Sequence, residues 1–118
     1  MEITENQIRE GINKMVKENP NVEPYRVGIT TQILNALVGQ EVELRNLNAD
    51  LDNPGFAIGN DNDPLENHEN EFTVVVEEDG ISVAEYDKEG NIEQMYGFEL
   101  FDTDSAVKMI MEQISGLG

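Results

Sequence analysis

The sequence has no cysteine, no tryptophan and no long apolar run. Without cysteine, the chain can form no disulfide, no thiolate nucleophile and no cysteine-based zinc site. Without an apolar run of about 18 residues, we expect no segment that spans a membrane. The N-terminal segment carries acids where a signal peptide needs bases, so we expect a soluble, cytoplasmic protein.

Basic residues are also scarce. The 118 residues include 25 Asp and Glu but only 7 Lys and Arg, which gives a formal net charge of −18. Between Asp50 and Asp104 there are seventeen carboxylates and one base, Lys88. A surface of this kind attracts cations and cationic proteins, and it repels nucleic acid and anionic membranes. The expected partner is therefore a basic protein, with no direct binding to nucleic acid or membrane.

The length of the chain fits one compact domain, which we place over residues 1–118. An apolar fraction of 38% allows only a thin core. Low apolar content and high net charge favour disorder. Amphipathic segments along the chain favour a folded domain, and we give them more weight because they are locally consistent.

Two helices are predicted at the start of the chain. Thr4 and Gln7 have the spacing of a capping box, which begins the first helix. Pro20 ends this helix, because the residue before a proline disfavours helical backbone. The second helix is expected to begin with Thr30 or Thr31 as its cap.

A strand and a loop are predicted to follow the helices. Within residues 41–47, Val42 and Leu44 alternate with Glu41, Glu43 and Arg45, which is typical of a strand with one wet face. Residues 48–71 are rich in polar residues and are predicted to form a long acidic loop. Only Phe56 and Ile58 suggest a brief extended stretch inside it. A connection of this length in a compact domain is usually functional or disordered.

The last part of the chain predicts a meander and a helix. Strands are expected over residues 72–77, 81–87 and 92–100, joined by hairpin turns. Thr103 or Ser105 is expected to cap the final helix. The order α-α-β-β-β-β-α indicates an α+β fold, with a three- to four-stranded antiparallel sheet and helices packed on one face.

Carboxylates cluster at both ends of the hairpin whose turn is predicted at Asp79 and Gly80. Like charges placed side by side lower stability, so such a cluster suggests a function. Glu85 and Asp87 would project to one side of a strand about 6.6–6.8 Å apart, a spacing similar to that of successive phosphates, with Glu93 nearby. The candidate partner-binding residues are Glu77, Glu78, Asp79, Glu85, Asp87, Glu89 and Glu93. The alternative is a solvated surface that serves solubility.

A cation site is a weaker possibility in the predicted loop. Asp50 and Asp52, with Asp61 and Asp63, resemble parts of a calcium-binding loop. Pro54 stands where such a loop needs a side-chain oxygen, so we favour a polar loop without metal. We expect no cofactor.

Catalysis is not expected. His68 is the only histidine, and no nucleophile motif accompanies it. The predicted function is therefore a small, non-enzymatic inhibitor that binds a basic nucleic-acid-handling protein or nuclease as a nucleic-acid mimic. A phage anti-defence protein, such as an anti-CRISPR or anti-restriction factor, and an immunity protein against a nuclease toxin are its concrete forms. The alternatives are an adaptor that forms a homodimer through its helices and a weak divalent-cation binder.

Overall fold

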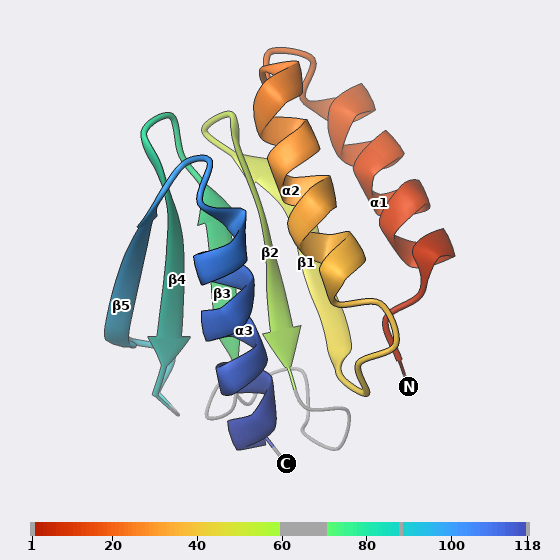
Figure 1. The fold of residues 1–118 in the computed structure, drawn as a ribbon. Coiled ribbons are helices and arrows are strands. Elements are labelled where there is room, and N and C mark those ends of the chain that lie inside the picture. The colour runs from red at the N-terminus through yellow and green to blue at the C-terminus, as the bar shows by residue number, and fades with distance from the viewer. Residues whose placement is uncertain (1, 60–70, 88, 118) are drawn as a thin grey trace.

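In the computed structural model, which describes residues 2–59, 71–87 and 89–117, three helices and a five-stranded antiparallel sheet make up the fold. The elements follow the order α-α-β-β-β-β-β-α. The three helices lie in front of the sheet in Figure 1. The predicted α+β class and antiparallel sheet are confirmed, but the sheet has five strands where three or four were expected.

Helix α1 spans Glu5–Glu18 and begins as predicted. The Gln7 N–H donates to Thr4 Oγ1 at 3.2 Å, and the Thr4 N–H donates to Gln7 Oε1 at 3.1 Å. These two bonds form the capping box that satisfies backbone N–H groups at the helix start. Asn19 ends the helix directly before Pro20, also as predicted.

Helix α2 spans Pro24–Ala36 and begins well before its predicted caps. Thr30 and Thr31 lie inside the helix, where their hydroxyls donate to the carbonyl oxygens of Arg26 and Val27 at 2.8 Å. The predicted start was therefore wrong. Proline is favoured at the first helical position because its missing N–H would have no partner there, so Pro24 was the better signal.

Helix α3 spans Thr103–Leu117. The Ser105 N–H donates to Asp102 Oδ1 at 3.3 Å, so the carboxylate of Asp102 caps the helix in place of Thr103 or Ser105. Thr103 is buried instead. Its hydroxyl oxygen accepts a bond from Gln32 Nε2 at 3.2 Å, which joins α3 to α2.

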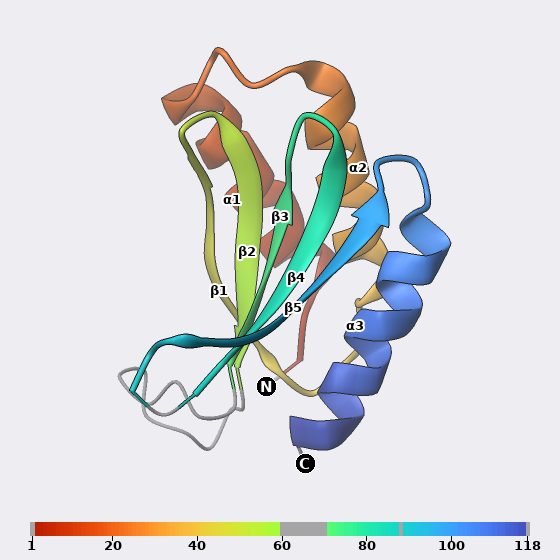
Figure 2. The same ribbon diagram turned by 90° about the vertical axis from the view of Figure 1, so that its left-hand side faces the viewer.

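The strands are β1 (Glu43–Asp50), β2 (Asn53–Gly59), β3 (Phe72–Val76), β4 (Gly80–Tyr86) and β5 (Ile92–Glu99). They lie in the sheet in chain order, each antiparallel to the next. The β1–β2 turn, the β3–β4 turn, the β5–α3 connection and the α1–α2 connection therefore meet at one end of the molecule (Figures 1 and 2). We call this end the apex, which comprises residues 19–23, 50–53, 77–80 and 99–102.

Strand β2 was missed in the sequence. Residues 48–59, expected to lie in a long loop, form the end of β1, a tight turn and all of β2. Six of the seven residues of β2 are buried, so the strand lacks the alternation that marks a half-exposed strand. The part of the expected loop over residues 60–70 lies outside the described residues.

The core lies between the helices and one face of the sheet. The sheet contributes alternate residues of its three central strands, namely Phe56, Ile58, Phe72, Val74, Val76, Ile81 and Val83. Ile33 and Leu34 of α2 and Ile110 of α3 are fully buried against them. The residues that alternate with these core residues form the other face, which we call the open face because the helices lie on the far side of the sheet.

Candidate partner-binding site

The seven predicted contact residues divide into two clusters at opposite ends of β4. One cluster, at the apex, comprises Glu77, Glu78 and Asp79, and the other comprises Glu85, Asp87, Glu89 and Glu93. Strand β4 has seven residues, which at about 3.3 Å each place the clusters about 20 Å apart. The predicted residues therefore do not form one continuous array.

The cluster away from the apex differs in detail from its predicted arrangement. Glu85 lies on the helix-facing side of β4, because it follows Val83 by two residues. Its partner on β5 is Gln94, and Glu93, which was expected near Glu85, lies at the β-bulge next to this pair. This cluster is thus less regular than the alternation in the sequence suggests.

Asp87 has a structural role in the β4–β5 loop. Its Oδ1 accepts the N–H group of Glu89 at 3.0 Å and that of Asn91 at 2.9 Å. Asp87 also lies beyond the end of β4, so strand alternation does not set its distance from Glu85. Side-chain bonds of this kind stabilise tight loops, and they occupy an oxygen that a partner would otherwise contact.

The apex cluster continues across the sheet. Glu77 is bonded to Gly80 across the β3–β4 turn, and Gly80 lies opposite Glu99 on β5. All three lie on the open face, because they alternate with the core residues. The backbones at Glu77 and Glu99 therefore lie two strand spacings apart, about 10 Å, with both side chains on the same face. The Ser82 hydroxyl holds the side chain of Glu77 in place by donating a hydrogen bond to its Oε1 at 2.9 Å.

Further acids reach the apex from other segments. Besides the β3–β4 turn, the apex carries Glu23, Asp50, Asp52, Glu99 and Asp102. The sequence alone assigned Asp50 and Asp52 only to a weak cation site and gave no role to Glu23. The missed signal is the connectivity, because every second connection of an antiparallel meander returns to the same end of the sheet.

A buried arginine lies beneath these acids. Arg26 is 2% exposed, and its Nη1 donates to Asn53 Oδ1 at 2.6 Å and to the carbonyl of Val76 at 3.3 Å, while Nη2 pairs with Glu23. The hydrogen bond from Arg26 holds the pKa of Glu23 below its usual value. The Tyr25 hydroxyl donates to the same carboxylate at 3.0 Å, which raises the pKa of Tyr25. Arg26 thus joins the apex segments without adding a base to the surface.

A second arginine is buried beside β1. Arg45 is 7% exposed and its Nη1 pairs with the buried Glu71 at 3.0 Å, while its Nε lies 3.3 Å from Glu43. Burial alone would lower the pKa of Arg45, but the bonds to Glu71 and Glu43 outweigh it and raise the pKa above its usual value. The guanidinium lies over Gly59, where a Cβ atom would collide with it.

Exposed bases are confined to the helices in the described part of the chain. Arg9, Lys14 and Lys17 lie on α1, which packs beside β1, and Lys108 lies on α3. None of the described turns of the apex contains an exposed base. Three of these four bases therefore lie on the helix beside β1, and the described apex turns carry acids as their only charged residues.

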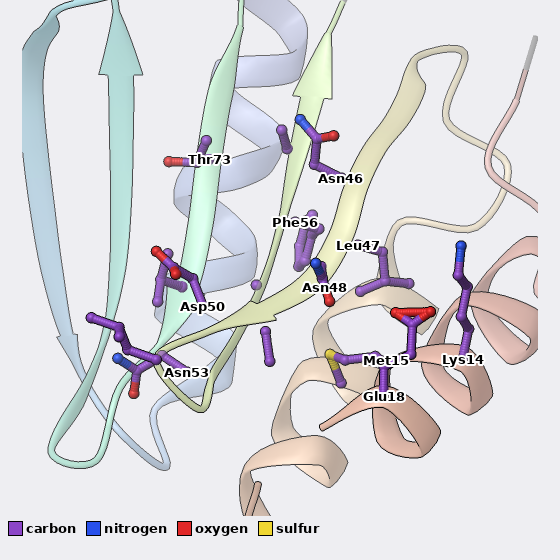
Figure 3. A pocket seen from close by; sticks show the side chains of 15 residues that line it. Lys14, Met15, Glu18, Asn46, Leu47, Asn48, Asp50, Asn53, Phe56 and Thr73 are labelled. Carbon is purple, nitrogen blue, oxygen red and sulfur yellow. The ribbon is translucent and has the colours of Figure 1, made fainter. Parts of the chain in front are cut away.

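A hollow of about 660 Å³ lies on the β1 side, between the C-terminal half of α1 and the first two strands. Figure 3 shows Lys14 and Glu18 on its α1 side and Asp50 and Asn53 near the β1–β2 turn. Its lining mixes a base, acids and amides with apolar side chains such as Leu47. The hollow is therefore less negative in character than the apex turns.

Within the described ranges, no group of three or more acidic or histidine side chains is placed to hold a metal ion. Asp50 ends β1 and Asp52 lies in the adjoining turn, both exposed, whereas Asp61, Asp63 and His68 lie outside the described residues. None of the helices that the structure describes is long and apolar enough to cross a membrane. No family model, curated protein or solved structure matches this chain.

Proposed function

We propose that the protein is a small acidic inhibitor that uses its apex to occupy the cationic groove of a nucleic-acid-handling protein. The observation that carries the proposal is the gathering of carboxylates from four chain segments at one end of the fold, with no exposed base in the described apex turns. Phage anti-defence proteins and immunity proteins against nuclease toxins are the classes of inhibitor that this surface fits.

Electrostatics explain why the apex suits a basic partner. Carboxylates presented together produce a field that steers a cationic surface and speeds association, most strongly at low ionic strength. Arginine and lysine side chains that normally grip phosphates make charge-assisted hydrogen bonds to carboxylates equally well. DNA carries one charge per about 1.7 Å of helix axis, so the apex reproduces the charge of only a short stretch of duplex.

The proposal is tested by reversing charge at the apex. Association with a panel of purified basic nucleases and DNA-binding proteins is measured at low salt and at roughly 1 M salt, where the Debye length is about 3 Å. The paired change Glu78→Lys and Asp79→Lys should lower the association rate of a bound partner by about tenfold or more at low salt and much less at high salt. The matched control, Glu5→Lys and Glu10→Lys on α1, makes the same change of charge far from the apex.

A third variant separates the two acidic clusters. Glu89→Lys with Glu93→Lys alters the cluster at the other end of β4 and should leave association nearly unchanged. If this variant loses binding and the apex variant does not, the contact surface is the other cluster. If no protein of the panel binds in a salt-sensitive way, the inhibitor function itself is wrong.

A further inference from the structure

Two backbone hydrogen bonds show which residues of β4 bond to β3 and which bond to β5. The Tyr86 N–H donates to the carbonyl of Glu71 at 3.3 Å, and the Glu77 N–H donates to the carbonyl of Gly80 at 2.8 Å. Since bonding partners alternate along an antiparallel strand, the even-numbered residues of β4 bond to β3. The odd-numbered residues of β4 therefore bond to β5.

This alternation identifies the backbone N–H and C=O groups of β5 that do not bond to β4 and could pair with another strand. The residues of β5 that lie opposite the odd-numbered residues of β4 are Gln94, Tyr96 and Phe98. Met95 and Gly97 alternate with them, so their N–H and C=O groups point away from the sheet. Among the described strands, β4 is the only neighbour of β5.

Among the residues that the structure describes, strand β5 has few of the common devices that protect an edge. Proteins blunt exposed edges with lysine, proline, very short strands or a covering element. Strand β5 is eight residues long and contains neither lysine nor proline. A bulge near Glu93 disturbs only its beginning, so the stretch from Gln94 to Glu99 remains regular.

Large apolar side chains are exposed along the same edge. Ile92 is 53% exposed, Met95 57% and Phe101, directly after the strand, 77%. Glu99 lies between Met95 and Phe101 in the sequence. Aromatic and methionine side chains bordered by charge are typical of the central part of a protein interface.

We propose that the outer edge of β5 binds an extended segment of a cationic partner as a sixth strand of the sheet. Backbone bonds to Met95 and Gly97 would supply the pairing, as in other cases of strand addition. This inference rests on the proposed function only for the sign of the partner's charge. A second copy of this chain is disfavoured because each copy carries a net charge of −18.

The two faces of β5 define the side chains of the added strand. Tyr96 and Phe98 point to the helix-facing side and are partly buried against the core. Met95 and Glu99 point to the open face. An added strand therefore fits best if apolar side chains extend the row of Tyr96 and Phe98 while lysine or arginine side chains lie beside Glu99. The inferred ligand is a segment in which apolar and basic residues alternate.

A matched pair of substitutions at Gly97 tests the pairing. A Cβ atom at Gly97 would meet no atom within 4 Å, so Gly97→Ala fits the strand and keeps the outward N–H. Gly97→Pro removes that N–H and fixes φ, a change that an edge strand tolerates where the N–H points outward. A synthetic peptide of alternating valine and lysine should bind the unchanged protein and Gly97→Ala similarly, and Gly97→Pro roughly tenfold more weakly.

Amide hydrogen exchange locates the peptide. Binding should slow the exchange of the Met95 and Gly97 amides and leave the amides of β1 unchanged. Protection along β1 alone, equal binding by Gly97→Pro, or equal binding of a valine–glutamate peptide would each overturn the inference. A dimer joined through β5, seen by sedimentation and by protection of the same two amides without peptide, would also overturn it.

The failure of this inference can be told apart from failure of the proposed function. The variant with Glu78→Lys and Asp79→Lys should retain peptide protection at Met95 and Gly97, because the altered turn lies beyond these positions. Loss of nuclease binding with retained peptide binding would leave the β5 edge supported. Retained salt-sensitive nuclease binding without any peptide protection would leave only the apex proposal standing.

Discussion

The two edges of the sheet are formed by strands of equal length, yet they are built in opposite ways. Strand β1 has eight residues, a bulge after Arg45 and a left-handed backbone at Asn46, with φ of 52°. Leu47, next in the chain, packs against Gly11 of α1. Strand β5, also of eight residues, has a bulge only at its start and exposes Met95 to solvent.

The difference shows how one sheet can hinder pairing with a further strand at one edge and allow it at the other. At β1, a bulge interrupts the strand and α1 packs beside it, and both hinder pairing with a foreign strand. At β5, no strand among those described pairs with the outer edge, and Ile92 and Met95 are exposed. We therefore expect substitutions at the β1 edge to change folding stability and substitutions at the β5 edge to change binding.

The largest effect is expected from removing the buried charge at the β1 edge. Arg45→Gln removes the ion pair between the guanidinium and the carboxylate of Glu71, which is 9% exposed. Breaking a buried ion pair from one side typically costs about 3–5 kcal/mol. The free energy of unfolding, measured by urea denaturation, should fall by about that amount.

The matched control for this prediction is Lys108→Gln, which removes an exposed base from α3. Exposed substitutions of this kind usually change stability by less than about 0.5 kcal/mol. Equal effects of the two variants would show that Arg45 does not hold the β1 edge together.

Proline substitution at two adjacent positions of β5 should have unequal effects. The Tyr96 N–H points to β4, whereas the Gly97 N–H points outward. Relative to Tyr96→Ala, the variant Tyr96→Pro lacks one hydrogen bond to β4 and should be less stable by about 3 kcal/mol. Relative to Gly97→Ala, the variant Gly97→Pro should lose less than about 1 kcal/mol of stability. The alanine variants serve as references because both Tyr96→Ala and Tyr96→Pro lack the tyrosine ring. A larger loss at position 97 than at position 96 would show that the Gly97 N–H does not point outward.

The smallest effect is expected where α1 meets β1. A Cβ atom at Gly11 would lie 2.5 Å from Leu47 Cδ2, so Gly11→Ala crowds this contact while gaining about 1 kcal/mol of helix propensity. In a Leu47→Ala background the crowding is absent, and Gly11→Ala should then raise stability by about 1 kcal/mol. A double-mutant cycle should give a coupling of about 1–2 kcal/mol between the two sites. Additive effects would show that Leu47 does not pack against Gly11 in solution.

Local signals predicted some elements correctly. The capping box of Thr4 and Gln7 and the stop before Pro20 depend only on neighbouring residues, so the sequence was sufficient for α1. The meander of β3, β4 and β5 was also predicted, because its core residues alternate and its turns contain glycine. These features need no information about distant contacts.

Elements that depend on distant contacts were missed. Strand β2 contains Pro54, Gly55 and Gly59, which suggest a loop, but Gly59 is needed because the guanidinium of Arg45 lies over it. The apex was missed for a related reason, since Glu23 and Asp50 lie far apart in the sequence, and their segments are joined by the bonds of Arg26 to Glu23 and Asn53. The sequence therefore predicted an excess of charge but not where the fold gathers it.

The buried Arg26 has a consequence for how the apex meets a partner. It ties Glu23 before α2, Asn53 in the β1–β2 turn and the end of β3 at Val76 into one unit. Loops that must become ordered on binding weaken association, whereas preorganised loops avoid that entropic cost. A guanidinium hidden beneath the surface thus keeps the carboxylates above it in position before any partner arrives.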